Sequence, residues 1–242
     1  MLKVIQFPVL EDNYIFLIHN EISGETAVVD PSLADPVLEK LSEYGWKLDY
    51  IINTHHHWDH TDGNEKLKAA TGAKIIAYAG DSHRISGIDI EVNDGDKIDI
   101  CGEMAKVTYI PGHTLGHISY YFAESKILFC GDTMFVMGCG RLFEGTPQQM
   151  FDSFQKLSKL PKDTVVYCAH EYSEANAKFA ITIEPENKEL QNRFKEVCKL
   201  RAEGKSTVPT TVAKELATNP FMRAEAVEEF ARVRKLKDEF KG

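Results

Sequence analysis

Short apolar runs with strand character, separated by turn residues, fill the chain up to about residue 170. These runs predict strands at Lys3–Pro8, Tyr14–His19, Thr26–Val29, Tyr50–Asn53, Lys74–Ala77, Lys97–Ile100, Ala105–Ile110, Ser119–Phe122, Lys126–Cys130 and Thr164–Tyr167. Helical spacing instead occurs at about 34–44, 63–70 and 147–158, and Thr146 followed by Pro147 favours a helix start at the last of these. The pattern predicts an α/β body.

The pattern changes at about residue 173, where strand-like runs stop and helical spacing with mixed charge continues to the end. The predicted helices are Ser173–Ile183, Glu186–Glu203, Thr211–Leu216 and Met222–Phe240. We therefore expect two domains, an α/β domain at 1–172 and a helical domain at 173–242.

Charge and cysteine usage narrow the class of protein. The 242 residues carry 28 basic and 37 acidic side chains, a net charge of −9, which argues against nucleic acid or an anionic membrane as the main partner. The five cysteines are odd in number and widely spaced, which favours free thiols in the cytoplasm over a disulfide framework. The opening residues lack the pattern of a signal peptide, and no apolar run has the length of a membrane span. We expect a cytoplasmic monomer acting on a small molecule.

Candidate chemistry is concentrated at 54–60, directly after a predicted strand. This segment reads Thr54-His55-His56-His57-Trp58-Asp59-His60. Imidazole and carboxylate are common ligands of zinc and related metals. In extended backbone His55 and His57 point to the same side, whereas Asp59 and His60 follow where the chain turns. The segment thus predicts two neighbouring metal ions. Its position within the chain, directly after a predicted strand, argues against a histidine-rich loop like an expression tag.

Three later side chains complete the candidate ligand set, and each follows an apolar run. They are His113, Asp132 and His170. Strand ends converge at one edge of a sheet, so these residues can meet the histidine segment. We assign His55, His57 and His113 to one metal, Asp59, His60 and His170 to the second, and Asp132 to a bridge between them.

This arrangement indicates metal-assisted hydrolysis of an acyl compound. Two ions with open coordination positions can share a water, lower its pKa and polarise a carbonyl. Asp59 and Asp132 are the candidate catalytic carboxylates. Zinc is the expected metal, with iron and manganese as alternatives, because histidine and carboxylate accept all three. Asp30, after an earlier strand, is a candidate to orient a ligand histidine, with turn capping as the alternative, and Trp58 is expected to pack between loop and sheet.

The motifs resemble those of the glyoxalase II (hydroxyacylglutathione hydrolase) family of the metallo-β-lactamase superfamily. The matching segments are 54–60, 131–135 (GDTMF), 138–141 (GCGR), 143–146 (FEGT), 168–172 (CAHEY), 219–223 (NPFMR) and 234–238 (RKLKD). The resemblance implies an αββα sandwich with a C-terminal helical domain. It also implies hydrolysis of S-D-lactoylglutathione to D-lactate and glutathione, the final step of methylglyoxal detoxification.

The resemblance also implies a set of glutathione-binding residues. They are Arg141, Phe143, Tyr172, Arg234 and Lys237. Charge pattern alone would make Arg234 and Lys237 a solvated helix face, since they are three residues apart. Phe143 stands where many family members have a tyrosine, so a hydrogen bond worth about 0.5–1.5 kcal/mol is lost if the tyrosine makes one.

Other functions remain compatible with parts of the pattern. A β-lactamase, a glutathione persulfide dioxygenase or another thioester hydrolase would use a related metal site. A metal-storage or metal-sensing module would explain the ligands without catalysis, although it would not need a separate anion-binding patch.

Overall fold

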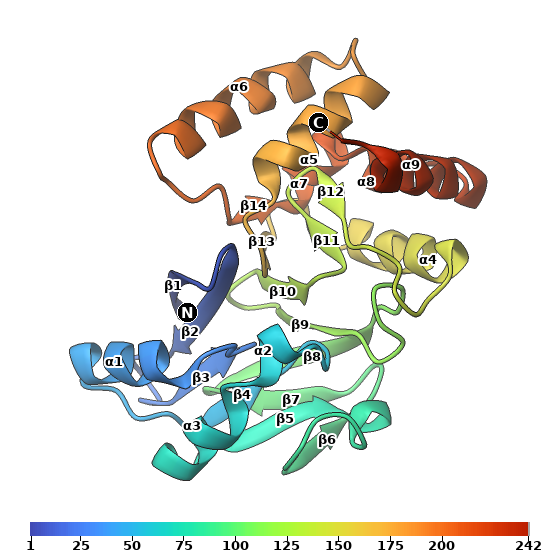
Figure 1. Cartoon of the computed structure of the whole chain (residues 1–242). Coiled ribbons are helices and arrows are strands. Elements are labelled where there is room, and N and C mark those ends of the chain that lie inside the picture. Colours follow the sequence, from blue (N-terminus) through green and yellow to red (C-terminus); the bar gives the residue numbers. More distant parts are fainter. Residues whose placement is uncertain (242) are drawn as a thin grey trace. The chain divides into compact units, whose positions relative to one another are not determined.

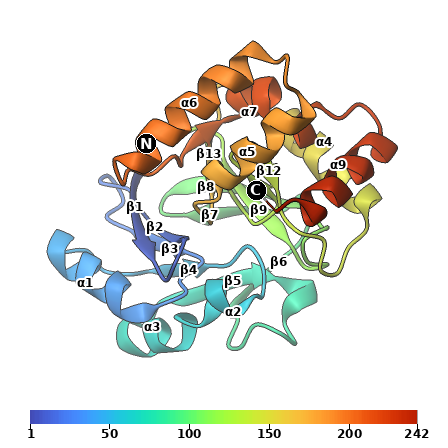
Figure 2. The same ribbon diagram turned by 45° about the horizontal axis from the view of Figure 1, so that its top comes forward.

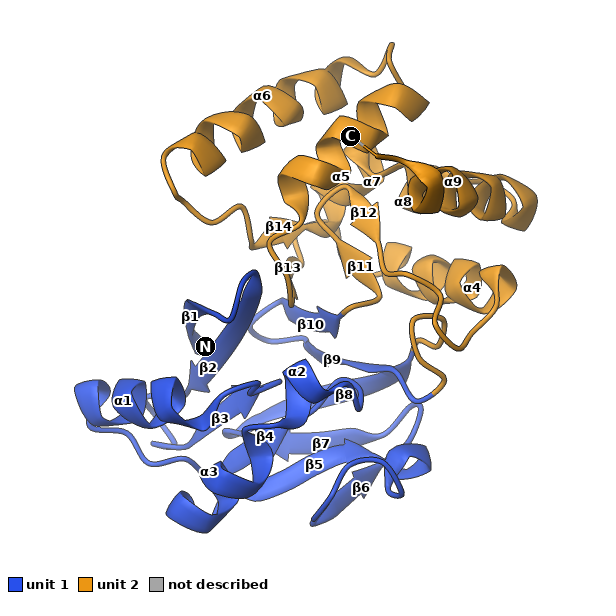
Figure 3. Ribbon diagram, viewed as in Figure 1, with its two compact units in different colours: residues 1–109, 116–131 blue, residues 110–115, 132–242 orange. Residues whose placement is uncertain are grey.

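The computed structural model describes residues 1–241, which form two compact units (Figure 3). Unit 1 comprises residues 1–109 and 116–131, and unit 2 comprises residues 110–115 and the chain from residue 132 onward. The second unit therefore includes one short loop from the first half of the sequence in addition to the C-terminal half.

The first sheet of unit 1 follows the chain in the order β1-β2-β3-β4-β5-β6 (Figure 1). Its strands are β1 (Lys3–Val9), β2 (Asn13–His19), β3 (Thr26–Val29), β4 (Tyr50–Ile52), β5 (Lys74–Tyr78) and β6 (Ile90–Val92). The strands pair antiparallel up to β3 and parallel from there on. The parallel part requires crossovers, which contain the helices α1 (Ala34–Tyr44), α2 (Trp58–Thr61) and α3 (Asn64–Thr71).

Both faces of the first sheet are buried, as strand β2 illustrates. Ile15 and Leu17 belong to a core cluster with Val37 of α1 and Leu67 of α3. Phe16 points to the opposite face, as the strand's two-residue period requires. There its ring lies 5.5 Å from that of Phe129 on the second sheet. Unit 1 is thus layered as helices, sheet and sheet.

The second sheet contributes four antiparallel strands to unit 1, in the order β10-β9-β8-β7. They are β7 (Lys97–Ile100), β8 (Glu103–Tyr109), β9 (Ile118–Phe122) and β10 (Ile127–Gly131). Tyr120 of β9 is fully buried, and its hydroxyl lies 3.2 Å from the Asn53 carbonyl oxygen and 3.3 Å from that of Ile76. This polar contact ties the second sheet to the ends of β4 and β5.

Unit 2 is mainly helical (Figure 2). Its elements are the hairpin β11 (Met134–Phe135) and β12 (Gly138–Cys139), the pair β13 (Val165–Cys168) and β14 (Thr210–Thr211), and the helices α4 (Pro147–Ser158), α5 (Ser173–Ile183), α6 (Lys188–Ala202), α7 (Val212–Thr218), α8 (Pro220–Arg223) and α9 (Val227–Glu239). Helix α4 begins with a capping box in which Thr146 and Gln149 satisfy each other's backbone N–H groups. Among the described residues no helix is long and apolar enough to cross a membrane.

The predicted strands and the three helices of the α/β part are confirmed to within a few residues. The sequence pattern missed β6, β11, β12, β14 and α2, which are too short to show a period. The predicted helix at Met222–Phe240 is divided, because Ala224 and Ala226 adopt extended backbone between α8 and α9.

Candidate metal centre

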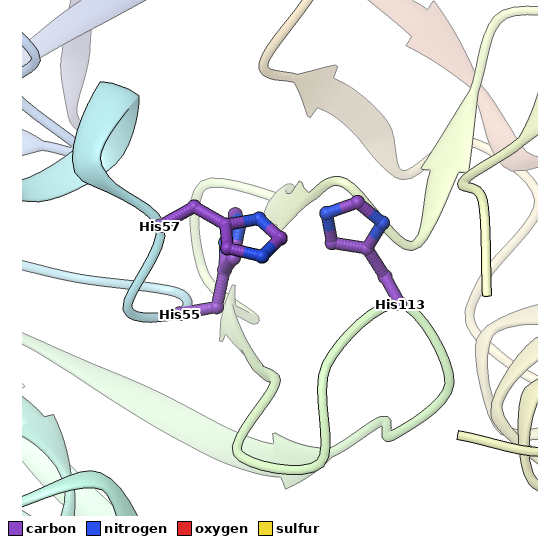
Figure 4. A group of neighbouring side chains, drawn as sticks. All are labelled: His55, His57 and His113. Atoms are coloured by element: carbon purple, nitrogen blue, oxygen red, sulfur yellow. The ribbon is translucent and has the colours of Figure 1, made fainter. Parts of the chain in front are cut away.

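The histidine segment leaves strand β4 in unit 1 and turns into the short helix α2. Figure 4 shows the side chains of His55 and His57 extending from this segment, together with His113 from a later loop. The Nε2 atom of His55 lies 3.0 Å from the Nδ1 atom of His57. Two nitrogens bound to one tetrahedral zinc at about 2.0–2.1 Å are roughly 3.3 Å apart. The pair therefore fits two ligands of one ion, as the two-residue spacing predicts.

Asp59 and His60 form a second pair within unit 1. The Oδ2 atom of Asp59 lies 3.5 Å from Nε2 of His60. The Asn13 side-chain amide donates to the same carboxylate oxygen at 3.0 Å, which holds the carboxylate in place. Unit 1 thus contains two neighbouring donor pairs, and their assignment to separate ions stays a prediction.

Asp30 orients this histidine segment from behind. Its carboxylate accepts hydrogen bonds from the backbone N–H and the hydroxyl of Thr54, both at 2.7 Å, and lies 3.1 Å from Nδ1 of His60. An ionised carboxylate can only accept, so Nδ1 of His60 must donate and Nε2 keeps its lone pair for a metal. Asp30 is 3% exposed and has a positive φ of 49°. Such a conformation is uncommon, and Asp and Asn tolerate it better than most residues.

His56 is directed away from the other histidines of its segment. Its Nε2 atom lies 3.4 Å from Nη1 of Arg84, and its Nδ1 atom lies 3.4 Å from Oδ2 of the buried Asp81. The Asp81 carboxylate lies between His56 and the backbone of Gly116. A Cβ atom added at Gly116 would clash with this carboxylate. Sequence reasoning missed Asp81 and Arg84, because the residues that follow β5 show no ligand pattern.

His117, which lies beside this segment, and Trp58, which belongs to it, differ in burial. His117 is fully buried and stacks on His55 at 4.6 Å between ring centroids, so it restricts the orientation of a candidate ligand. The prediction that Trp58 packs between loop and sheet is wrong, because this side chain is 63% exposed. It occupies the first position of the four-residue helix α2, which leaves its side chain in solvent.

Unit 2 brings together the other three candidate ligands. The Oδ2 atom of Asp132 lies 3.4 Å from Nε2 of His113 and 3.3 Å from Nε2 of His170. One carboxylate oxygen therefore faces two imidazoles at the separation expected of ligands that share an ion. All three side chains are buried. Donor chemistry and spacing in both units fit a two-metal site.

The orientation of His113 is fixed by its other ring nitrogen. Its Nδ1 atom lies 2.8 Å from the Arg141 carbonyl oxygen, which can only accept, so Nδ1 carries the proton and Nε2 faces Asp132. The loop before it depends on Gly112, whose φ is 150° and whose added Cβ would meet Met150 of α4 at 2.8 Å. Helix α4 also donates the Ser153 hydroxyl to the Pro111 carbonyl at 2.8 Å.

The candidate glutathione residues all belong to unit 2. Arg234 of α9 is only 6% exposed, so it is not part of a solvated helix face. Its Nη1 atom donates to the Cys139 carbonyl at 2.6 Å, and its Nη2 atom lies 2.8 Å from Oδ1 of Asp238. Arg141 is exposed, and its Nε atom lies 3.9 Å from the same Asp238 oxygen. One carboxylate thus lies between two guanidinium groups.

Lys237 adds a third cation to this cluster. Its ammonium group donates to the Ala175 carbonyl at 3.1 Å and lies 5.3 Å and 5.6 Å from the ring centres of Phe179 and Phe240. Burial, and then the nearby charge of Arg234, lower the pKa of Lys237 to about 8. The cluster of Arg141, Arg234, Lys237 and Asp238 has a local excess of positive charge in a protein of net charge −9.

Phe143 and Tyr172 lie against two of the candidate metal ligands. The Phe143 ring is 60% exposed and meets the His113 ring edge-on, with centroids 5.2 Å apart. The Tyr172 ring is stacked on His170, with centroids 4.9 Å apart and the planes 2° from parallel. Both rings therefore have a face or edge on a candidate ligand and a part that reaches solvent.

Comparison with known proteins defines the class first. The model of the Metallo-beta-lactamase superfamily matches residues 11–170. Two solved structures with the same fold are ETHE1 from Myxococcus xanthus and the BLEG-1 B3 metallo-β-lactamase. ETHE1 has a TM-score of 0.74 and 24% identity over 97% of this chain and 90% of that one. BLEG-1 has a TM-score of 0.70 and 20% identity over 93% of this chain and 100% of that one. The predicted fold class, a metallo-β-lactamase α/β fold with a C-terminal helical region, is confirmed.

Full-length relatives then narrow the class to one family. The model "Hydroxyacylglutathione hydrolase C-terminus" matches residues 171–240. A hydroxyacylglutathione hydrolase of Methylococcus capsulatus is 50% identical over 100% of both chains, and one of Rhodospirillum rubrum is 51% identical over 99% of both. The chain belongs to the hydroxyacylglutathione hydrolase family of the metallo-β-lactamase superfamily.

Replacement of Asp30 by asparagine tests how His60 is oriented. Asp30→Asn keeps the size and tolerates the positive φ, but it replaces a carboxylate oxygen that accepts from Thr54 and His60. We expect metal affinity to fall about 10- to 100-fold, as for other partners of metal-binding histidines. Chelator competition measures this affinity. Asp81→Asn, at a similarly buried carboxylate, is the control and should retain metal; equal losses in both variants would contradict an orienting role of Asp30.

Proposed function

We propose that this protein hydrolyses S-D-lactoylglutathione and related hydroxyacylglutathiones to the hydroxy acid and glutathione. This would be the last step of methylglyoxal degradation. The observation that carries the proposal is the full-length identity of about one half to hydroxyacylglutathione hydrolases, combined with ligand clusters whose spacing suits metal ions. The same identity supports a boundary at 172/173 between a catalytic and a glutathione-binding domain, because the two family models meet at 170/171.

The proposed metal ligands divide as the sequence pattern suggests. His55, His57 and His113 would hold one ion, Asp59, His60 and His170 the other, and Asp132 both. Support comes from each unit taken alone. The pairs His55–His57 and Asp59–His60 in unit 1, and His113–Asp132 and His170–Asp132 in unit 2, have donor atoms 3.0–3.5 Å apart. Zinc is the proposed metal, with iron or manganese as alternatives that the same ligands accept.

In the proposed reaction the protein side chains hold and orient the reacting groups. Two bound ions would supply Lewis acidity and lower the pKa of an attacking water. Asp59 and Asp132 would act as catalytic carboxylates by fixing the ions and accepting hydrogen bonds from that water. The departing glutathione leaves as a thiolate, a better leaving group than an amine, so no dedicated general acid is needed.

The proposed glutathione site is the cationic cluster of unit 2. Arg234 and Lys237 would pair with the glycine carboxylate of glutathione, while Arg141, Phe143 and Tyr172 would contact the rest of the tripeptide. Support comes from the local charge: Asp238 lies against the guanidinium groups of Arg141 and Arg234, and Lys237 adds a third cation, so the cluster can accept another anion. Arg234 is already held by Cys139 and Asp238, which reduces the entropy lost on binding.

A cytoplasmic location and a monomeric state complete the proposal. All five cysteines are free thiols in the part of the chain that the structure describes, as expected in the reducing compartment where glutathione is abundant. A glutathione persulfide dioxygenase is the alternative on this scaffold. The likeness to ETHE1, at 24% identity, shows only a shared fold.

The proposed function is tested by turnover with defined metal content. We expect close to two ions per chain, rapid hydrolysis of lactoylglutathione, and no comparable reaction with glutathione persulfide or a cephalosporin. Asp132→Ala should lose one ion and most of kcat while it stays folded, because a shared ligand is removed. Full activity at one ion per chain, or near-normal kcat in a fully loaded Asp132→Ala protein, would refute the two-metal mechanism.

Removal of the Lys237 charge should weaken substrate binding more than chemistry. Lys237→Met keeps the apolar stem over Phe179 and Phe240 but loses a charge-assisted bond worth about 1.5–3 kcal/mol before solvent screening, so KM should rise about tenfold with kcat changed less. In the wild type KM should also rise with pH above about 8, where Lys237 loses its proton.

The control for Lys237 is a short thioester that lacks the glycine carboxylate. Lys237→Met should leave its kcat/KM unchanged and should remove the rise of KM above pH 8 for lactoylglutathione. Arg234→Lys should not restore a site weakened by Arg234→Ala, because lysine cannot grip a carboxylate at two points. If both thioesters lose activity equally, the cluster supports the fold and does not bind glutathione.

Phe143→Tyr tests the departure from the tyrosine common in the family. The ring is exposed beside His113, so a hydroxyl can be added without a clash in the core. If it reaches the tripeptide, about 0.5–1.5 kcal/mol is gained and KM falls roughly 2- to 12-fold. KM is measured for lactoylglutathione and for the short thioester, where no gain is expected. An unchanged KM for both would show that the hydroxyl has no partner in this protein.

A further inference from the structure

The hairpin β11–β12 carries parts of both proposed sites of unit 2. Asp132 lies two residues before β11, the Cys139 carbonyl at the end of β12 accepts from Arg234, and the Arg141 carbonyl two residues later lies 2.8 Å from Nδ1 of His113. A shift of this hairpin would therefore move a metal ligand, the backbone partner of a second ligand, and the backbone partner of a glutathione residue.

The tip of this hairpin is held by side chains from the helical part of unit 2. Asn219, the N-cap residue of α8, donates its amide hydrogens to the carbonyls of Phe135 at 3.2 Å and Gly138 at 2.9 Å. Asn176 of α5 donates to the Val136 carbonyl at 3.3 Å. Backbone groups at the tip thus find partners outside the hairpin, whose own two-residue strands provide few.

Glu215 of α7 links Asn219 to the same tip. Its Oε2 atom accepts from the Met137 backbone N–H and from the Asn219 amide, both at 2.9 Å. Its Oε1 atom accepts from Arg193 at 2.6 Å and from the Thr210 hydroxyl at 2.7 Å. Glu215 and Asn219 are both fully buried. One oxygen of the carboxylate therefore faces the hairpin, while the other faces the helices and β14.

We propose that Asn219, oriented by Glu215, is a positioning residue for the metal and glutathione sites. The proposal rests on the proposed function and adds to it a role for the segment 219–223. The hydrogen bonds of the Asn219 side chain run to the hairpin backbone, to Glu215 and to the Phe221 N–H. Asn219 acts through the backbone of the hairpin, whose displacement changes the separation of Asp132 from His113 and His170.

The isosteric change Asn219→Asp separates this role from helix capping. The aspartate keeps an oxygen for the Phe221 N–H, the cap bond that is 3.0 Å long here, and aspartate is a favourable N-cap residue. It loses the amide hydrogens that bind the Phe135 and Gly138 carbonyls and the Glu215 carboxylate. We expect metal retention in chelator competition to fall at least about tenfold. We also expect KM for lactoylglutathione to rise, because both effects follow from displacement of the hairpin.

Thr210→Val is the matched control within the same buried cluster. It removes one donor from the Oε1 side of Glu215 and leaves the contacts on the hairpin side unchanged. It should lower the free energy of unfolding without changing metal retention or KM. Asn176→Ala is a milder second variant for the case that Asn219→Asp does not fold. It removes the hydrogen bond to the Val136 carbonyl and should weaken metal retention by a smaller factor in a stable protein.

The outcomes are separable from those of the proposed function, because metal retention is measured without substrate. If the wild type binds metal but does not hydrolyse lactoylglutathione, the proposed function fails and the positioning role is still tested. The positioning role is overturned if folded Asn219→Asp and Asn176→Ala both retain metal within about twofold of the wild type. It is also overturned if Thr210→Val shifts metal retention and KM as much as Asn219→Asp.

Discussion

The spacing that a metal ion imposes on its ligands is the constraint on which the rest of this structure depends. Donor atoms bound to one ion must lie roughly 3.3 Å apart, which brings lone pairs closer than they would otherwise settle. Here hydrogen bonds to the second ring nitrogen of two candidate ligand histidines hold the rings in the required orientation. Asp30 binds the outer nitrogen of His60, and the Arg141 carbonyl lies against that of His113. Each of these partners is itself held in place. Asp30 accepts a hydrogen bond from the backbone N–H of Thr54, and Arg141 follows two residues after the end of the hairpin β11–β12.

The need for these outer partners explains why buried polar groups lie near the candidate ligands. Asp30 adopts a positive φ and Gly112 a φ of 150°, conformations that most residues avoid. Buried carboxylates are costly unless hydrogen-bonded, and both oxygens of Asp30 and of Glu215 accept hydrogen bonds. The favourable packing of the surrounding sheets and helices offsets the unfavourable free energy of these local conformations.

Charge is organised on two scales. The whole protein is acidic, which favours solubility and disfavours polyanions. Within unit 2, however, Arg141 and Arg234 lie against Asp238 and Lys237 adds a further positive charge, and the burial of Arg234 and Lys237 strengthens their field compared with exposed side chains. The charge of this cluster is thus opposite in sign to that of the whole protein.

The sequence by itself determined the fold class and most strands and helices, and it supplied seven candidate ligands whose sorting into pairs stays a prediction. Alternation along strands and the two-residue spacing of His55 and His57 are local properties, so they can be read without coordinates. The roles of Asp81, Glu215 and Asn219 were decided only by the tertiary structure. Their partners lie far away in the chain, as with the 78 residues that separate Glu215 from Met137, and no local period marks such contacts. The burial of Arg234 and the exposure of Trp58 also depended on packing, because the surface that covers a helix face comes from elsewhere in the chain.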